Sequence, residues 1–444
     1  MTTPRIMIAA QSSGSGKTTI SCGILQALVN RGLKVSSFKC GPDYIDPMFH
    51  KKVIGADSTN VDPFFSDDEQ LKYLFSRSAD RTDIAVIEGV MGFYDGSSLD
   101  SSKDSSCDIS LKLDAPVILI VDSSGSSYSA LAVLKGFMDL ERNNIKGVIF
   151  NRMSERVFDS IRHHVIDMGI TPIGYIPKMK DIKLESRHLG LVMPDEISDI
   201  KAMLNEVANR FERTLDIDAI IKLAGTAKDI VSKEPPTSDL RYDVKVAVAD
   251  DEAFCFIYHD NIELLESLGV KIVRFSPIHD KAMPDADALI LYGGYPEMHA
   301  KELSENHTMI ASIKNNLSKG MPCLAECGGF MYLHERMEGA DGIMYDMCGV
   351  IKGSTWKTEG LVRFGYVRLN SPNLEGTIKA HEFHHWDSDN NGEDWTATDV
   401  KGNNYRCIHD NGNMIVGFPH MYYYSNPEFV HSFLKKASNF KEGH

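Results

Sequence analysis

The stretch QSSGSGKTTI, residues 11–20, lies between an apolar run at residues 4–10 (PRIMIAA) and a helical pattern that begins near Lys17. In such a strand, loop and helix, glycines let backbone N–H groups turn inward towards phosphates, and the helix N-terminus adds its partial positive charge. Lys17 can reach the terminal phosphates of a nucleotide, and Thr18 can offer its hydroxyl to Mg²⁺. The stretch therefore predicts an ATP site at the start of an α/β fold.

One position of this loop departs from the usual phosphate-loop pattern, G-x-x-x-x-G-K-[ST]. Gln11 stands where the first glycine is expected, whereas Gly14 and Gly16 supply flexibility nearer to the lysine. A glycine-rich turn that merely caps a helix is the structural alternative. Asn151, at the end of a later strand, is a candidate for the adenine end of ATP. The other candidates for ATP contact are Gly14, Ser15, Gly16, Lys17, Thr18 and Thr19.

The composition is that of an ordinary globular protein of two or three domains, with 444 residues, 43% apolar and 25% charged. The formal net charge of −15 argues against nucleic-acid and anionic-membrane partners, which bind through clustered Lys and Arg. No apolar run approaches the length of a membrane span, and we expect no signal peptide. The eight cysteines include no C-x-x-C pair, so we expect mostly buried thiols in a reducing cytoplasm. The oligomeric state stays open, with a homodimer as one arrangement.

Apolar runs alternate with helical patterns in both halves of the chain, which predicts buried parallel strands with helices between them. The pattern breaks at a polar, proline-containing segment and then restarts. We therefore predict a phosphate-loop, parallel-sheet ATP domain over residues 1–225, a linker over 226–243 and a second α/β domain over 244–444. The tail from about Cys348 is richer in short strands.

Two further segments follow predicted strands and carry polar side chains. Glu88 ends the apolar run DIAVIE, and a carboxylate at the carboxyl end of a strand beside the phosphate-loop strand is well placed to hold Mg²⁺. The loop FKCGPDYIDPMFH follows another strand, and its chemically active side chains are Lys39, Asp43, Tyr44 and Asp46. The structural alternatives are an ordinary strand-end acid and a simple turn.

The segment CLAECGGFMYL has the form of a nucleophile elbow, with Cys327 at a sharp turn between a strand and a helix. The start of a helix is expected to lower the pKa of the thiol and so make the thiolate accessible. Gly294, which follows an upstream strand, and Gly328 can turn N–H groups towards a developing oxyanion. The alternative for Cys327 is a buried structural cysteine, which we favour for the other seven.

Three of these segments together, SGSGKTT, KCGPDYIDP and IEGVMGFYDG, resemble the cobyrinic acid a,c-diamide synthase family. The resemblance spans nearly the whole chain. It implies a dethiobiotin-synthetase-like ATP domain joined to a second α/β domain of the class I, triad-type glutamine amidotransferases. It also makes Asp46 a further candidate for metal or substrate contact, beside the Mg²⁺ ligands Thr18 and Glu88. The candidate substrate contacts are Asp43, Tyr44 and His188, and an exposed helix-cap role is the alternative for His188.

The same resemblance assigns the histidines of the second half. In this family branch the general base falls in a segment ending SNP, which maps it onto His420 in GFPHMYYYSNP. Glutaminases of this type usually carry Glu two residues after the histidine. Tyr422 stands there instead, so the group that orients the base stays unnamed. The cluster AHEFHHW, with His381, His384 and His385, is either a structural or substrate-binding segment, which the resemblance favours, or a zinc site.

The implied reaction joins both halves of the chain. Cys327 forms a thioester with L-glutamine and releases ammonia, while ATP phosphorylates a carboxylate that ammonia then converts to an amide. The implied substrate is a tetrapyrrole with acetate side chains. Cobyrinic acid is the first choice and nickel-sirohydrochlorin, from coenzyme F430 synthesis, is the second. A P-loop ATPase switch without glutaminase and a non-enzymatic tetrapyrrole carrier are the alternatives from other classes.

Overall fold

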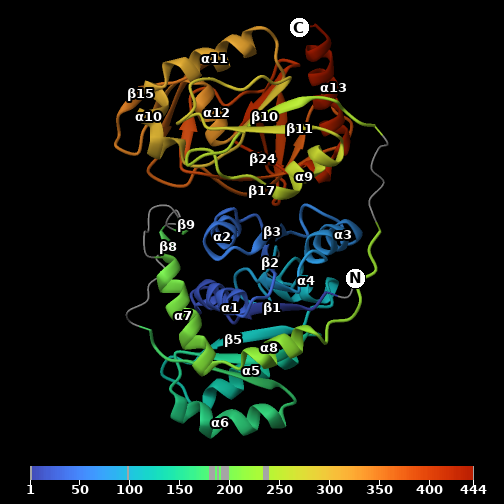
Figure 1. Ribbon diagram of the computed structural model, residues 1–444, viewed down its shortest axis with the longest axis vertical. Helices are drawn as coiled ribbons and strands as arrows, with labels where there is room; N and C mark the ends of the chain where they lie inside the picture. Colours follow the sequence, from blue (N-terminus) through green and yellow to red (C-terminus); the bar gives the residue numbers. More distant parts are fainter. Residues whose placement is uncertain are drawn as a thin grey trace. The chain divides into compact units, whose positions relative to one another are not determined.

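The structure is a computed structural model that describes residues 3–97, 100–179, 186–187, 190–191, 200–233 and 240–443. The chain divides into two compact units, residues 1–235 and 236–444, which are described separately (Figure 1). Among the helices in the described ranges, none is both long enough and apolar enough to cross a membrane.

The first unit is built on a seven-stranded sheet of order β3-β2-β4-β1-β5-β6-β7, in which every neighbouring pair is parallel. β3 was not predicted, because its sequence DSTNV contains a single apolar residue. The strands are β1 (Arg5–Ala10), β2 (Val35–Cys40), β3 (Asp57–Val61), β4 (Ile84–Glu88), β5 (Val117–Asp122), β6 (Ile145–Asn151) and β7 (Thr171–Ile176). The predicted buried parallel sheet is confirmed.

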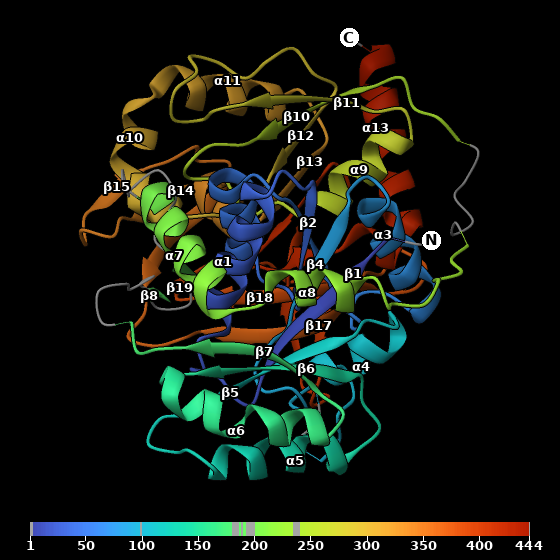
Figure 2. The ribbon, with the colours of Figure 1, turned by 60° about the horizontal axis from the view of Figure 1, so that its bottom comes forward.

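Two helical layers cover this sheet, because alternate side chains of each strand point to opposite faces. From β1, Ile6 and Ile8 pack with α1 (Lys17–Asn30), α7 (Ile200–Thr214) and α8 (Ile217–Ala224). Met7 and Ala9 face a second core on the opposite side. That core includes residues of α3 (Asp68–Ala79), α4 (Ser106–Lys112), α5 (Ser129–Leu140) and α6 (Glu155–Asp167). In Figure 2, strands β5 to β7 lie between α5 and α6 on one side and α1 and α8 on the other.

Short elements complete the first unit. After β2 the chain forms α2 (Ile45–Phe49), which continues into a wider helical turn, η1 (His50–Ile54). Beyond β7 the described residues include the two-residue strands β8 (Ser186–Arg187) and β9 (Gly190–Leu191). α2 and η1 matter for function, because they place the loop after β2 against the carboxyl end of β4.

The second unit holds a six-stranded sheet of order β11-β10-β12-β13-β23-β22, parallel except for the β22–β23 pair. Its strands are β10 (Lys245–Ala249), β11 (Lys271–Phe275), β12 (Ala288–Leu291), β13 (Cys323–Glu326), β22 (His409–Asp410) and β23 (Met414–Gly417). Its helices are α9 (His259–Ser267), η3 (Pro296–His299), α10 (Ala300–Glu305), α11 (His307–Ser318), α12 (Gly328–Leu333), η4 (Tyr423–Ser425) and α13 (Pro427–Gly443). The predicted second α/β fold is present.

Two small sheets account for the strand-rich tail. One has the order β15-β14-β16-β19, from β14 (His334–Glu338), β15 (Met344–Asp346), β16 (Ile351–Lys357) and β19 (Trp386–Ser388). The other has the order β21-β20-β17-β18-β24, from β17 (Arg363–Asn370), β18 (Ile378–His384), β20 (Trp395–Asp399), β21 (Asn404–Cys407) and β24 (His420–Met421). β24 belongs to this last small sheet and directly follows β23 of the six-stranded sheet. Its histidine therefore lies near the end of the six-stranded sheet.

Candidate active sites

The predicted phosphate loop joins β1 to α1, and two of its glycines adopt angles that favour glycine. The angle φ is +78° at Gly14 and +87° at Gly16, in the left-handed region. A Cβ at Gly16 would also lie 2.7 Å from Asn151 Nδ2, so a side chain there would displace the Asn151 amide. Gln11, in place of the usual first glycine, donates its N–H to Ile120 O at 3.1 Å. That position therefore continues the pairing with β5 instead of turning a glycine N–H towards phosphate.

Asn151, at the carboxyl end of β6, reaches across to this loop. Its Nδ2 donates to Ser15 O at 2.8 Å. A cavity of about 450 Å³ borders Asn151, Gly16 and Thr19, together with Arg152. The structure thus brings the predicted adenine-end residue to a cavity beside the predicted phosphate loop.

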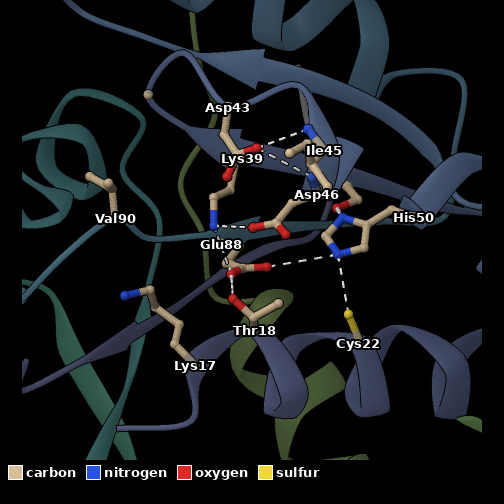
Figure 3. A network of polar contacts seen from close by, with 12 residues as sticks. Lys17, Thr18, Cys22, Lys39, Asp43, Ile45, Asp46, His50, Glu88 and Val90 are labelled. Carbon is tan, nitrogen blue, oxygen red and sulfur yellow. Dashed lines mark hydrogen bonds and ion pairs between the residues drawn. The ribbon is translucent and has the colours of Figure 1, made fainter. Parts of the chain in front are cut away.

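A polar cluster lies at the carboxyl ends of β2 and β4, beside the start of α1 (Figure 3). Thr18 Oγ1 donates to Glu88 Oε1 at 2.8 Å, and Lys39 Nζ lies 2.8 Å from the same oxygen. Lys39 also forms an ion pair with Asp46. Lys17 points away from this cluster and donates to Met91 O at 2.7 Å. Lys39 has no predicted role, and the structure places it between two predicted metal ligands.

Burial and charge together set the protonation of this cluster. Burial alone would lower the pKa of Lys39, but Glu88, Asp46 and Asp43 hold that pKa well above its usual value. Burial likewise opposes ionisation of Asp46, yet the positive charge of Lys39 keeps the pKa of Asp46 below its usual value. For Asp43, burial and the negative charge of Asp46 raise the pKa. Burial and the charge of Lys39 lower the pKa of Lys17. The cluster therefore contains an ammonium group held by carboxylates.

The donor atoms of this cluster fit Mg²⁺. Thr18, Glu88 and Asp46 offer only oxygens, which a hard cation prefers, and Mg²⁺ in nucleotide sites uses one or two carboxylates plus phosphate oxygens. Glu88 is 1% exposed, and no hydrogen bond reaches its Oε2 from the residues that the structure describes. Its Oε2 lies 3.7 Å from His50 Nε2. An additional cation has a reason to bind here, because a buried carboxylate oxygen without a hydrogen bond is costly.

The two predicted substrate residues that the structure describes lie at the start of α2. Asp43 Oδ1 accepts from the N–H of Ile45 at 2.9 Å and so fixes the turn that precedes the helix. Tyr44 is the residue immediately before α2 and is half-buried. The third predicted contact, His188, lies outside the described residues.

In the second unit, Cys327 occupies a sharp turn between β13 and α12. Its φ is +46° and its ψ −105°, an unusual conformation for a residue other than glycine. Its N–H donates to Gly417 O at 2.8 Å, which ties the turn to β23. A Cβ at Gly329 would lie 2.2 Å from Leu291 O, so the helix can follow the turn only with glycine there. This is the strand, turn and helix that the sequence predicts for a nucleophile elbow.

Gly293 marks the point where the predicted nucleophile and base meet. A Cβ built there would lie 2.4 Å from His420 Cε1, 3.2 Å from His420 Nε2 and 3.3 Å from Cys327 Cβ. The two predicted oxyanion donors are neighbours as well, because a Cβ at Gly328 would lie 3.2 Å from Gly294 N. All four predicted residues of this centre therefore gather within one small region.

The protonation of Cys327 differs from the expectation. Burial raises the pKa of its thiol far above the usual value, and the acidic groups of Glu297, Glu382 and Glu326 raise it further. Burial lowers the pKa of His420 to about 3. The expectation that the helix start would lower the thiol pKa was wrong for the resting protein, because desolvation outweighs the contribution of a six-residue helix. Cys327 and His420 are both neutral before substrate binds.

Two residues near His420, Tyr422 and Glu326, bear on which group orients this histidine. Tyr422, which stands where such sites usually carry Glu, donates its hydroxyl to Asp260 at 2.7 Å. Glu326, which precedes the predicted nucleophile, has its Oε2 3.8 Å from His420 Nδ1. Sequence reasoning missed Glu326, although it stands in the quoted elbow segment, because side-chain direction at the turn has no sequence signal.

The zinc interpretation of the histidine cluster receives no support. Within the described ranges, no set of three or more His, Cys, Asp or Glu side chains is arranged to hold a metal ion. His384 Nδ1 instead contacts Trp386 O at 2.6 Å, and its ring stacks on Phe418 with centroids 4.0 Å apart. His381 is buried and pairs with His420 across β18 and β24.

Comparisons with known proteins agree with this two-site architecture. Residues 6–192 match the CobQ/CobB/MinD/ParA nucleotide binding domain, and residues 245–427 match the CobB/CobQ-like glutamine amidotransferase domain. A cobyrinate a,c-diamide synthase of Fusobacterium nucleatum is 37% identical over 442 residues, covering 96% of this chain and 98% of that protein. Proteins of the same name from Picrophilus torridus (35% identical, 98% and 99% covered) and Clostridium tetani (37%, 97% and 99%) match equally fully. The chain belongs to the cobyrinate a,c-diamide synthase family.

Proposed function

We propose that this protein uses ATP and L-glutamine to convert the a and c acetate side chains of cobyrinic acid into amides. The main support for this proposal is the presence, in one chain, of both a phosphate loop with a carboxylate cluster and a cysteine–histidine centre. A P-loop switch needs only the first, so the glutamine amidotransferase domain argues against that class. The full-length similarity to proteins named cobyrinate a,c-diamide synthase supports the substrate.

In the second unit, Cys327 is the nucleophile that attacks the side-chain amide of glutamine. His420 takes the thiol proton and returns it to the departing nitrogen, so that ammonia leaves and a thioester forms. The N–H groups of Gly294 and Gly328 stabilise the negative oxygen of the tetrahedral intermediate. Water then hydrolyses the thioester to glutamate and restores the thiol.

In the first unit, a substrate carboxylate attacks the terminal phosphate of ATP, the bond to the β-phosphate oxygen breaks, and ADP leaves. A carboxylate is a poor electrophile because hydroxide leaves badly, whereas phosphate leaves readily once an acyl phosphate has formed. The loop N–H groups and Lys17 hold the phosphates, and Lys39 supplies positive charge beside Asp46. Bound Mg²⁺, held by Thr18, Glu88 and Asp46, would neutralise phosphate charge. Ammonia then displaces phosphate and leaves an amide.

Nickel-sirohydrochlorin is the second candidate substrate, because it also carries acetate groups that an enzyme of this kind amidates. The deciding experiment incubates the protein with ATP, Mg²⁺, glutamine and each tetrapyrrole separately, and follows the products by mass spectrometry. Two successive mass decreases, each matching the replacement of a hydroxyl group by an amino group, identify the substrate. Glutamine hydrolysis without a mass change in either tetrapyrrole would refute both substrates. Binding without turnover of ATP or glutamine would instead favour a carrier.

A further inference from the structure

Glu326 is a buried carboxyl group that ordinary packing does not explain. Its side chain is 1% exposed, and neither carboxyl oxygen has a hydrogen-bond partner in the described part of the chain. The backbone of Met421 moderates the rise in the pKa of this carboxyl group. Buried polar groups are nearly always paired, so an exception in a folded protein calls for a reason. The partner within ion-pair distance is His420, whose Nδ1 lies 3.8 Å from Glu326 Oε2.

The orientation of the His420 ring fits a relay through both of its nitrogens. Nε2 borders the point beside Gly293 that Cys327 Cβ also borders. Nδ1 is the atom that faces Glu326. The imidazole therefore lies with one nitrogen towards the thiol and the other towards the carboxyl group. That arrangement lets the first act as a base while the second donates its proton.

The sequence position at which such glutaminases usually carry an acid holds a tyrosine, and the side chain of this tyrosine has a different partner. Tyr422 stands two residues after His420, and its hydroxyl donates to Asp260. Asp260 is buried on α9 and accepts this hydrogen bond. Glu326 comes from a different strand, β13, and immediately precedes Cys327. One turn of the chain thus delivers both the nucleophile and the carboxyl group behind the base.

We propose that Glu326 is the positioning residue that orients His420 and stabilises its protonated form, in place of the acid that Tyr422 replaces. The proposal rests on the glutaminase half of the proposed function. His420 directs Nδ1–H towards Glu326, which leaves the lone pair of Nε2 facing Cys327. As the sulfur–carbon bond forms, the thiol proton passes to Nε2, and the positive ring then lies beside Glu326. The proton leaves with ammonia as the carbon–nitrogen bond breaks.

Burial acts on both members of this pair. Burial raises the pKa of Glu326 well above its usual value and lowers the pKa of His420 to about 3. Each charge is therefore unfavourable alone, and the two stabilise each other when they arise together. Two other titratable groups approach His420 from β18, His381 and His384, and burial lowers the pKa of each to about 4. Both are neutral near neutral pH, so neither of these two rings opposes a positive charge on His420.

The test compares two amide substitutions of the same type in the full-length protein, Glu326→Gln and Asp260→Asn. For Glu326→Gln, we expect kcat for glutamine hydrolysis to fall by about 10²-fold with KM nearly unchanged. That loss is smaller than for a directly hydrogen-bonded triad acid, whose loss costs about 10⁴-fold. Amidation supported by free ammonia should keep its wild-type rate, which shows that the variant is folded. Asp260→Asn should hydrolyse glutamine at close to the wild-type rate.

A pH profile separates positioning from a purely structural role. Because Glu326 titrates with a raised pKa, Glu326→Gln should displace the acidic limb of the kcat/KM profile, whereas Asp260→Asn should leave it in place. Glu326→Asp should recover part of the lost rate. The proposal is overturned if Glu326→Gln hydrolyses glutamine like the wild type, or if its profile is merely scaled down. It is also overturned if Asp260→Asn is the slower variant. A wild-type protein that does not hydrolyse glutamine would refute the proposed function itself.

Discussion

Gly293→Ala is the substitution that tests the geometry of the glutaminase centre most directly. The added Cβ would stand 2.4 Å from His420 Cε1, whereas ordinary contacts begin at 3.4 Å, so the imidazole must move by about 1 Å. The backbone at Gly293 does not require glycine, since its φ is not positive. The effect is therefore steric and falls on the base. A displacement of this size at a reacting group costs about 10²-fold in rate, or about 2.7 kcal/mol of transition-state stabilisation.

The assay measures amide formation with glutamine and, separately, with an ammonium salt at mildly alkaline pH. We expect Gly293→Ala to lose about 10²-fold with glutamine and to keep its rate with ammonia, because the first unit is unchanged. Gly360→Ala is the matched control, since a Cβ there meets nothing within 4 Å and its φ is not positive. A Gly293→Ala variant that uses glutamine at the wild-type rate would refute the placement of His420 as the base.

Three further variants test the remaining assignments. Cys327→Ser keeps the shape but not the nucleophilic thiolate, so glutamine should no longer support amidation while ammonium salts restore it; unimpaired use of glutamine would exclude Cys327 as the nucleophile. Lys17→Ala should weaken ATP binding in calorimetric titration and abolish amidation while glutamine hydrolysis persists; wild-type ATP affinity and amidation would contradict the phosphate-loop assignment. Glu88→Gln removes a carboxylate charge without changing size, so the rate measured against Mg²⁺ should show a raised requirement; an unchanged curve would move the ligand elsewhere, with Asp46 next.

Much of the first unit could be predicted because its signals are local. The glycines of the phosphate loop and the apolar runs around them act over a few residues, and Gly16 proves to need both its angle and its small size. β3 was not predicted because the sequence DSTNV does not by itself favour a strand, and pairing with β2 holds it in the sheet. Local patterns cannot identify a strand that is held mainly by pairing.

The second site was predicted less completely because its properties depend on burial. The position of Cys327 before a helix predicts a lowered thiol pKa, but burial of the thiol raises that pKa instead. Glu326 was overlooked because its meeting with His420 depends on β24 returning to the end of β13. Lys39 was seen without a role for the same reason, since its partners Glu88 and Asp46 come from other elements.

The strand orders of the two sheets also set when each site can assemble on the ribosome. β1 lies between β4 and β5, so its loop gains both flanking strands once the nascent chain has extended past Asp122. The backbone of Cys327 is hydrogen-bonded to Gly417 at the end of β23, and His420 lies in β24, which follows β23. The nucleotide loop of a growing chain can therefore fold early. The centre of Cys327 and its base can form only after residues much later in the chain have been synthesised. Domains generally fold in order of synthesis, so the ammonia-producing half should be the last to mature.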